Sequence, residues 1–227
     1  MSDRLATKTW SALDESFMGR AFELARDGLG KTAPNPSVGC VIVRNGIVVG
    51  EGRTQVSGRP HGEAVALAIA GNQADGSFVY VTMEPCAHES NRGPACSDAL
   101  IQAGVKSVTI SVLDPDPRTT GQGVRRLRQA DIEVHVGLFS EAGQTQIAGF
   151  VKRLRTGLPW LHVGQDDGTF DAVLHDGITA SLSQMILELG QEGMMRVCIS
   201  PGSFLAKQAM LLGIVDSIDK PSTASGG

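Results

Sequence analysis

Three side chains of the kinds that bind zinc lie at junctions between strand-like and helix-like segments. His61 begins the helix-like segment 61–70, and Cys96 begins a second one. Cys86 follows the apolar run 78–83, separated from it only by Glu-Pro. One ion can bind all three only where strand ends and helix starts meet at one edge of a sheet. That requirement constrains the fold more strongly than any other feature of the sequence.

The surrounding segments alternate between strand and helix. Asn45-Gly46 between two β-branched runs is a strong hairpin signal. The pattern predicts helices over 14–27, 61–70, 96–103 and 123–129, and strands over 38–43, 47–52, 78–83, 105–113 and 132–136. Helical connections between strands favour right-handed crossovers and a largely parallel sheet covered on both faces. Because the segment 61–70 is almost wholly apolar, we expect that helix to be buried.

Beyond residue 137 the periodicity is weaker. It predicts helices over 141–155, 180–189 and 204–212, a short strand that begins at Leu158, strands over 196–200 and 214–218, and a polar loop over 165–177. The tail 220–227 is small and polar, which is typical of a disordered end. We expect two domains, over 1–155 and 156–219, followed by this tail.

Composition and charge exclude several classes of protein. The chain is 41% apolar, carries a formal charge of −4, and has only 7 Phe, 2 Trp and 1 Tyr. Without a basic surface or base-stacking aromatics, a nucleic-acid partner is not expected. The sequence contains neither a long apolar stretch nor a signal-like N-terminus, so we expect no membrane association and a cytoplasmic location. Cys40 and Cys198 lie in apolar runs and are interpreted as core residues.

The residue types predict a catalytic zinc. Three protein ligands, His61, Cys86 and Cys96, leave the fourth tetrahedral position open. Zinc lowers the pKa of water in that position from about 15.7 to about 7. Glu63, two residues beyond the histidine, is close enough to move protons without binding the metal. The order His-x-Glu, Pro-Cys, Cys is the signature of zinc deaminases that act on pyrimidine or purine rings.

Two further expectations concern this cluster. A helix that began at Cys86 would point its N–H groups at the site and favour the thiolate form of that cysteine. An alternative is a purely structural zinc, for which His88 would be the fourth ligand. That alternative leaves Glu63 without a role.

Longer runs resemble a known family. The segments 32–43, 61–63, 80–86, 94–96 and 114–117 are similar to those of the bacterial riboflavin-biosynthesis pyrimidine deaminase. The resemblance covers residues 14–155. It implies a cytidine-deaminase-like three-layer αβα sandwich, zinc as cofactor, and a phosphoribosylated diaminopyrimidine as substrate. The substrate contacts that it implies are Asn35 at the ring or ribose, Asp114, Asp116 and Arg92 near the phosphate, and His88.

The sequence also departs from that family. Gly62 stands where the family has Ala, and Gly inside a helix costs about 1 kcal/mol relative to Ala. The segment between the two cysteines is one residue longer. Asp116 replaces an Asn, which places an extra carboxylate beside the expected phosphate. Because an anion beside a phosphate is unfavourable, these differences favour a substrate that is related to that of the family rather than identical to it.

Residues 156–219 resemble the family less completely. Residues 187–218 resemble only the last part of the family's reductase domain, so we interpret 156–219 as a truncated remnant that is too short for a nucleotide-binding sheet of that type. A homodimer is expected.

Two alternatives to the family function remain open. They are a deaminase of a related base or nucleoside (guanine, cytosine or tRNA) and a non-catalytic, zinc-stabilised partner of a separate reductase. Deaminases of tRNA or free bases typically place two residues between the cysteines, and this chain has nine.

Overall fold

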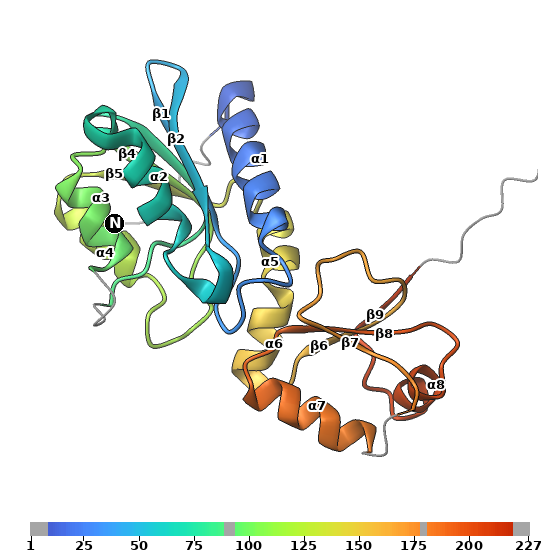
Figure 1. The fold of residues 1–227 in the computed structure, drawn as a ribbon. Helices are drawn as coiled ribbons and strands as arrows, with labels where there is room; N and C mark the ends of the chain where they lie inside the picture. Colours follow the sequence, from blue (N-terminus) through green and yellow to red (C-terminus); the bar gives the residue numbers. More distant parts are fainter. Residues whose placement is uncertain (1–8, 89–93, 178–180, 220–227) are drawn as a thin grey trace, which may run out of the picture. The chain divides into compact units, whose positions relative to one another are not determined.

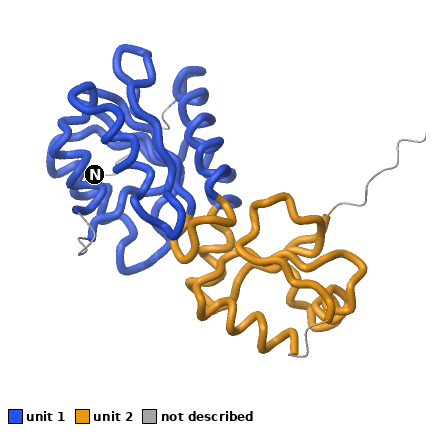
Figure 2. Tube along the Cα trace, viewed as in Figure 1, with its two compact units in different colours: residues 1–28, 37–146 blue, residues 29–36, 147–227 orange. Residues whose placement is uncertain are grey.

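The computed structural model describes residues 9–88, 94–177 and 181–219, and its contacts divide the chain into two compact units (Figures 1 and 2). The first unit contains residues 1–28 and 37–146, and the second contains 29–36 and 147–227. The short loop 29–36 thus belongs to the second unit by its packing, although it precedes most of the first. These packing units do not test the expected boundary after residue 155 or the remnant interpretation, which stay predictions.

The first unit has a mixed five-stranded sheet in the order β2-β1-β3-β4-β5. Its strands are β1 (Gly39–Arg44), β2 (Ile47–Arg53), β3 (Phe78–Met83), β4 (Ser107–Val112) and β5 (Glu133–Val136). The predicted hairpin between β1 and β2 is confirmed. The expectation of a largely parallel sheet holds only for β3, β4 and β5, because β1 is antiparallel to both of its neighbours. The hairpin places β1 between β2 and β3, and the helical crossover then makes β3 run parallel to β2.

Helices cover both faces of this sheet, so the predicted three-layer αβα sandwich is confirmed (Figure 1). One face carries α1 (Ala12–Asp27) and α5 (Ser140–Gln146), and the other carries α2 (Gly62–Ala70), α3 (Cys96–Gln102) and α4 (Gln122–Gln129). Two short 3-10 turns, Val56–Gly58 and Gly71–Ala74, flank α2. Under α1 lies a core of Met18, Ala21, Val41, Val43, Tyr80 and Leu138.

Helix α2 approaches the sheet unusually closely. A Cβ atom on Gly50 of β2 would lie 2.2 Å from the carbonyl oxygen of Ala66. One on Gly52 would lie 2.7 Å from the carbonyl oxygen of Gly62. The helix backbone therefore rests directly on β2. The expectation that α2 is buried all round is wrong, because its outer face is open and Ile69 is 60% exposed.

The second unit has its own fully parallel sheet in the order β7-β8-β6-β9. Its elements are α6 (Ala148–Thr156), β6 (Trp160–Val163), β7 (Ala172–Leu174), α7 (Leu182–Gln191), β8 (Arg196–Ile199), α8 (Phe204–Leu211) and β9 (Ser217–Ile218). Side chains from both helices α7 and α8 and from the sheet, such as Leu182, Leu205 and Val197, form a separate core. This segment is therefore an ordered parallel sheet.

Two downstream predictions need correction. The single helix predicted over 141–155 is broken at Ile147, which has φ −92° and ψ 6°. Its two halves serve different cores: Gly143 of α5 packs on Ser111 and Val112, and Gly149 of α6 packs on the carbonyl of Met195. The polar loop predicted over 165–177 contains the short strand β7, whose three residues are too few to give a periodic signal.

Both remaining cysteines, Cys40 and Cys198, are fully buried core residues, as predicted. Within the described residues, no helix combines the length and apolar character needed to cross a lipid bilayer.

Candidate metal centre

The three predicted ligands converge at the carboxyl end of the first unit's sheet. The ligand atoms of His61, Cys86 and Cys96 all lie within 4.8 Å of one another. The Nδ1 atom of His61 lies 3.3 Å from Sγ of Cys96 and 3.7 Å from Sγ of Cys86. Tetrahedral zinc with ordinary bond lengths sets nitrogen and sulfur ligands about 3.5 Å apart. The cluster therefore fits one zinc ion.

Each ligand is placed by the end of a secondary-structure element. His61 is the N-cap residue of α2, and Cys96 is the first residue of α3. Cys86 follows β3 in an irregular segment, so the expectation of a helix that begins at Cys86 is wrong. The expected effect nevertheless has a counterpart, because the backbone N–H of Cys96 donates to Sγ of Cys86 over 3.3 Å. The positive end of α3 is therefore directed at this sulfur.

The two cysteine side chains have opposite pKa shifts. A hydrogen bond from Cys96, with help from His61, holds the pKa of Cys86 well below its usual range. The same hydrogen bond, together with burial, raises the pKa of Cys96. Zinc binds cysteine side chains as thiolates, so binding to both sulfurs is coupled to the release of protons.

Glu63 lies in the first turn of α2 and is only 3% exposed. Burial raises the pKa of its carboxyl group to about 7, against the opposing effect of His61. A carboxyl group with this pKa can accept and release a proton near neutral pH. Among the residues that the structure describes, the ligand cluster consists of His61, Cys86 and Cys96, and the exposed His88 is not part of it.

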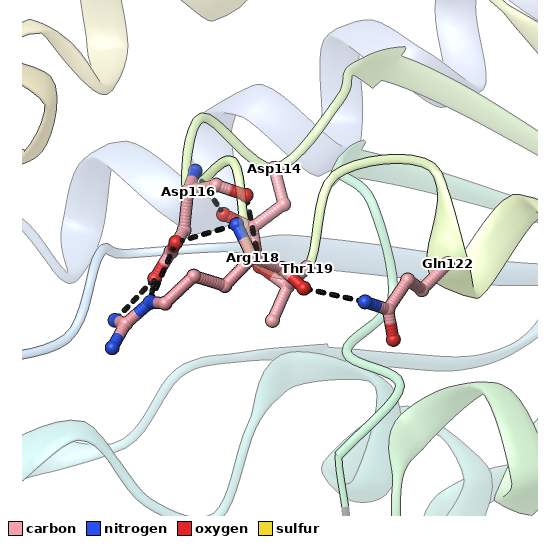
Figure 3. A network of polar contacts seen from close by, with 5 residues as sticks. All are labelled: Asp114, Asp116, Arg118, Thr119 and Gln122. Atoms are coloured by element: carbon pink, nitrogen blue, oxygen red, sulfur yellow. Dashed lines mark hydrogen bonds and ion pairs between the residues drawn. The ribbon is translucent and has the colours of Figure 1, made fainter.

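The predicted substrate contacts Asp114 and Asp116 lie in a turn after β4 and take part in local bonding (Figure 3). Asp114 accepts hydrogen bonds from the Asp116 N–H at 2.9 Å and the Thr119 hydroxyl at 2.8 Å. Asp116 accepts from the Arg118 backbone and guanidinium, with Nη2 to Oδ2 at 2.5 Å. Gln122 closes the turn by donating to the Arg118 carbonyl.

The extra carboxylate of Asp116 is therefore neutralised within the turn. Its hydrogen bonds with Arg118 lower its pKa to about 2, with a smaller contribution from the charge of His88. Asn35 belongs to the second unit, and Arg92 lies outside the described residues. The substrate roles of all these residues stay predictions.

Sequence reasoning passed over two residues of this region. Glu84 is a carboxylate that is only 3% exposed, directly after β3, and it accepts hydrogen bonds from three backbone amides. Arg118 pairs with Asp116 two positions earlier. The available signals were an acidic residue at the end of an apolar strand and an i,i+2 pair of opposite charges.

The layers of this unit, the His-Cys-Cys cluster and the buried glutamate beside it define a zinc-binding deaminase domain of the cytidine-deaminase-like class. The model of the family described as "Cytidine and deoxycytidylate deaminase zinc-binding region" matches residues 11–112. The structure of Acinetobacter baumannii RibD, form 1, is similar with a TM-score of 0.76 and 26% identity, over 92% of this chain and 87% of that chain.

Two curated relatives show to which family within this class of deaminases the chain is similar. The chain is 49% identical over 150 residues to the riboflavin biosynthesis protein RibD of Escherichia coli, which corresponds to 66% of this chain and 41% of the relative. It is also 49% identical over 146 residues to the diaminohydroxyphosphoribosylamino-pyrimidine deaminase of Buchnera aphidicola subsp. Schizaphis graminum, which corresponds to 64% of this chain and 99% of the relative. The chain belongs to the family of these riboflavin-biosynthesis pyrimidine deaminases, as the sequence motifs predicted.

The match is uneven along the relatives. The chain spans about two fifths of the length of the Escherichia coli protein, but nearly the whole of the Buchnera protein. These two alignments each leave about a third of this chain unmatched.

Proposed function

We propose that this chain catalyses the zinc-dependent hydrolytic deamination of a phosphoribosylated diaminopyrimidine. The reaction consumes water, replaces a ring amino group with oxygen and releases ammonia. The observation that carries the proposal is the arrangement of one histidine and two cysteines at zinc-ligand spacing beside the buried carboxyl group of Glu63. The substrate class follows from the name of the Buchnera relative, of which the chain covers 99%.

His61, Cys86 and Cys96 would hold the zinc ion. When bound, zinc supplies a water molecule acidic enough to act as a nucleophile near neutral pH. Glu63 takes one proton of the attacking water and delivers it to the ring nitrogen. It then takes the second water proton from the new hydroxyl group on the ring carbon and delivers it to the departing amine, which leaves as ammonia. A group that must both accept and donate works best with a pKa near the working pH, and burial brings Glu63 to about 7.

Substrate recognition is proposed to involve Asn35, His88, Arg92, Asp114 and Asp116. Asp114 and Asp116 lie together in the turn after β4, where Asp114 accepts a hydrogen bond from the N–H of Asp116. The pairing of Asp116 with Arg118 removes the objection that a free carboxylate would repel a phosphate. The family substrate is therefore favoured over an unphosphorylated relative.

The organisation of the whole chain belongs to the same proposal. Residues 1–155 would form the deaminase domain and 156–219 a remnant of a reductase, with function as a cytoplasmic homodimer. Tight binding of NADPH would contradict the remnant interpretation, and sedimentation of the purified protein at the mass of a monomer would contradict the dimer.

The deciding experiment is an ammonia-release screen on the purified, zinc-loaded chain. The substrates are the phosphoribosylated diaminopyrimidine, cytosine, guanine and their nucleosides. Turnover of the phosphoribosylated compound above all others is expected. Preference for a free base or nucleoside would support the alternative deaminases instead. Stoichiometric zinc without ammonia from any substrate would favour the non-catalytic alternative.

A further inference from the structure

Glu84 is a buried carboxylate whose two oxygens both accept hydrogen bonds from backbone amides. Oε2 accepts from the N–H of Asp114 at 3.1 Å and from that of Gly121 at 2.9 Å. Oε1 accepts from the N–H of Val124 at 3.1 Å. The side chain thereby joins the end of β3 to the turn after β4 and to the first turn of α4, which are 30 to 40 residues away in sequence.

This arrangement suits a side chain that only accepts hydrogen bonds, because all three partners are N–H donors. A carboxylate is purely an acceptor, so it can satisfy three N–H groups at once, whereas an amide must present a donor on one side. Negative charge is also favoured at the N-terminus of α4. Helix α4 packs closely against this segment, because a Cβ atom on Gly123 would lie 2.1 Å from the carbonyl oxygen of Pro85. Helix α4 therefore rests on the backbone between Glu84 and Cys86.

Cys86 is held from its other side by α3. Its carbonyl oxygen accepts from the N–H of Ser97 at 3.1 Å and from the Ser97 hydroxyl at 3.0 Å. The segment that carries this ligand is thus fixed between two helix starts, with Glu84 on one side and the fully buried Ser97 on the other. Groups that orient a metal ligand without touching the metal tune its affinity.

We propose that Glu84 is a positioning residue that fixes the Cys86 sulfur for zinc and ties it to the Asp114–Gly121 turn. This inference rests on the proposed zinc site. Glu84 binds the backbone of the Asp114–Gly121 turn and lies two residues before Cys86. The turn is therefore held in a fixed position relative to this metal ligand. Glu84 itself contacts neither metal nor reacting atoms in this proposal.

The test compares four full-length proteins: wild type, Glu84→Gln, Glu84→Asp and Asp171→Asn. Asp171 is a matched control in the second unit, because it also accepts from two backbone amides, those of Met195 at 2.7 Å and Arg196 at 2.8 Å. The probe is Co²⁺, which reports the geometry of a tetrahedral site through its d–d absorption and thiolate charge-transfer bands. Affinity is measured by competition with a chelator, and stability by thermal unfolding of the metal-free protein.

Glu84→Gln is expected to weaken metal affinity by about 10- to 100-fold, the usual effect of losing such support. Its d–d bands should shift, and Glu84→Asp, which keeps the charge, should restore part of the affinity. Asp171→Asn should lower the melting temperature and leave the spectrum and affinity unchanged. If Glu84→Gln does not fold, the test rests on Glu84→Asp, whose metal affinity should be measurably lower than that of wild type but not abolished.

Wild-type affinity and spectrum in the folded Glu84 variants would overturn the proposal. An equal loss in Asp171→Asn would also overturn it, because general destabilisation would then explain the effect. A wild-type protein that binds Co²⁺ without thiolate bands would overturn the zinc site itself, and with it this inference. If the inference alone fails, the wild-type cobalt spectrum shows thiolate bands and the folded Glu84 variants have the same affinity and spectrum as wild type.

Discussion

In both units, polar side chains lie at or near the ends of parallel strands, but these side chains are arranged differently in the two units. In the first unit, the ligand atoms of His61, Cys86 and Cys96 point at one another within 4.8 Å, beside a buried glutamate. In the second unit, His162 contacts Ser217 at 2.9 Å and Asp219 at 3.1 Å. The second set is a hydrogen-bonded link between neighbouring strands. Polar side chains near strand ends are thus common to both units. The candidate metal centre differs in having nitrogen and sulfur ligands that converge beside Glu63, whose carboxyl pKa is raised.

Loss of a ligand gives the largest expected effect. His61→Ala should abolish stoichiometric zinc and reduce ammonia release to background. Zinc at 100 times its dissociation constant should stabilise wild type by about 2.7 kcal/mol, and should not stabilise the variant. Thermal unfolding with and without zinc measures this. The control is His162→Ala, whose zinc response should equal that of wild type; a reduced response there would break the comparison between the two sheet ends.

Glu63→Gln should retain zinc and lose activity. The amide keeps the size of the side chain but can no longer accept the water proton, so the rate should fall by about 100- to 10,000-fold. Metal analysis and ammonia release on one preparation separate the two properties. Ser200→Ala, which removes the hydroxyl that contacts His175 in the second unit, should keep full activity. Full activity in Glu63→Gln would exclude the proposed proton transfer.

Gly62→Ala should destabilise the protein although Ala favours helices. A Cβ atom there would lie 2.6 Å from the carbonyl oxygen of Val38, and such overpacking costs about 1–3 kcal/mol. Gly19→Ala in α1 is the control. Among the described residues, no atom outside its own helix lies within 4 Å of the added Cβ, so the change should stabilise the protein by about 1 kcal/mol. Chemical denaturation measures both, and stabilisation by Gly62→Ala would contradict the close approach of α2.

Arg118→Gln should raise KM for the phosphorylated substrate by about 10-fold, equivalent to about 1.4 kcal/mol, and leave kcat largely intact. The substitution uncovers the charge of Asp116, which then repels the phosphate. Adding Asp116→Asn to the same protein should restore KM, and added salt should reduce the difference. An unchanged KM in Arg118→Gln would place the turn away from the phosphate.

The smallest effect is expected at the edge of the first unit. Arg20 forms two hydrogen bonds with Glu51, at 3.0 and 2.6 Å, which lower the pKa of Glu51. The depressed pKa means that the pair stabilises above the unfolded pKa of about 4.3, and loses this contribution as pH falls through the folded pKa. Because both side chains are well exposed, Arg20→Gln should cost about 0.2–1 kcal/mol at pH 7. The difference from wild type should vanish in acid; a difference that persists there would point to lost packing.

Some features of the fold were readable from the sequence. Apolar runs and the Asn-Gly turn located the strands and the hairpin. Residue types and their order identified the three side chains that the structure brings together as a candidate metal centre. Which face of α2 is buried was not readable, because its apolar residues surround the helix and the contact depends on Gly50 and Gly52 of another element. The break at Ile147 likewise reflects two separate cores, not local periodicity.

The supporting part of the site was less predictable. Glu84 binds amides that are 30 to 40 positions away, and a backbone N–H has no sequence signature. The pairing of Asp116 with Arg118 is local and could have been found from opposite charges two residues apart. Long-range interactions of side chains with the backbone therefore mark the limit of inference from one sequence.

The loop 29–36 changes how the second unit should be regarded. A Cβ atom on Gly30 would lie 2.6 Å from the carbonyl oxygen of Phe170, and Arg153 donates to the carbonyl of Pro34. The chain therefore passes between the units three times, at residues 28–29, 36–37 and 146–147. Cutting the chain after residue 146 or 155 would leave this loop, and Asn35 within it, without the surface on which it is folded. In terms of connectivity, the second unit includes a segment from the first half of the chain, so the two units are not consecutive stretches of sequence.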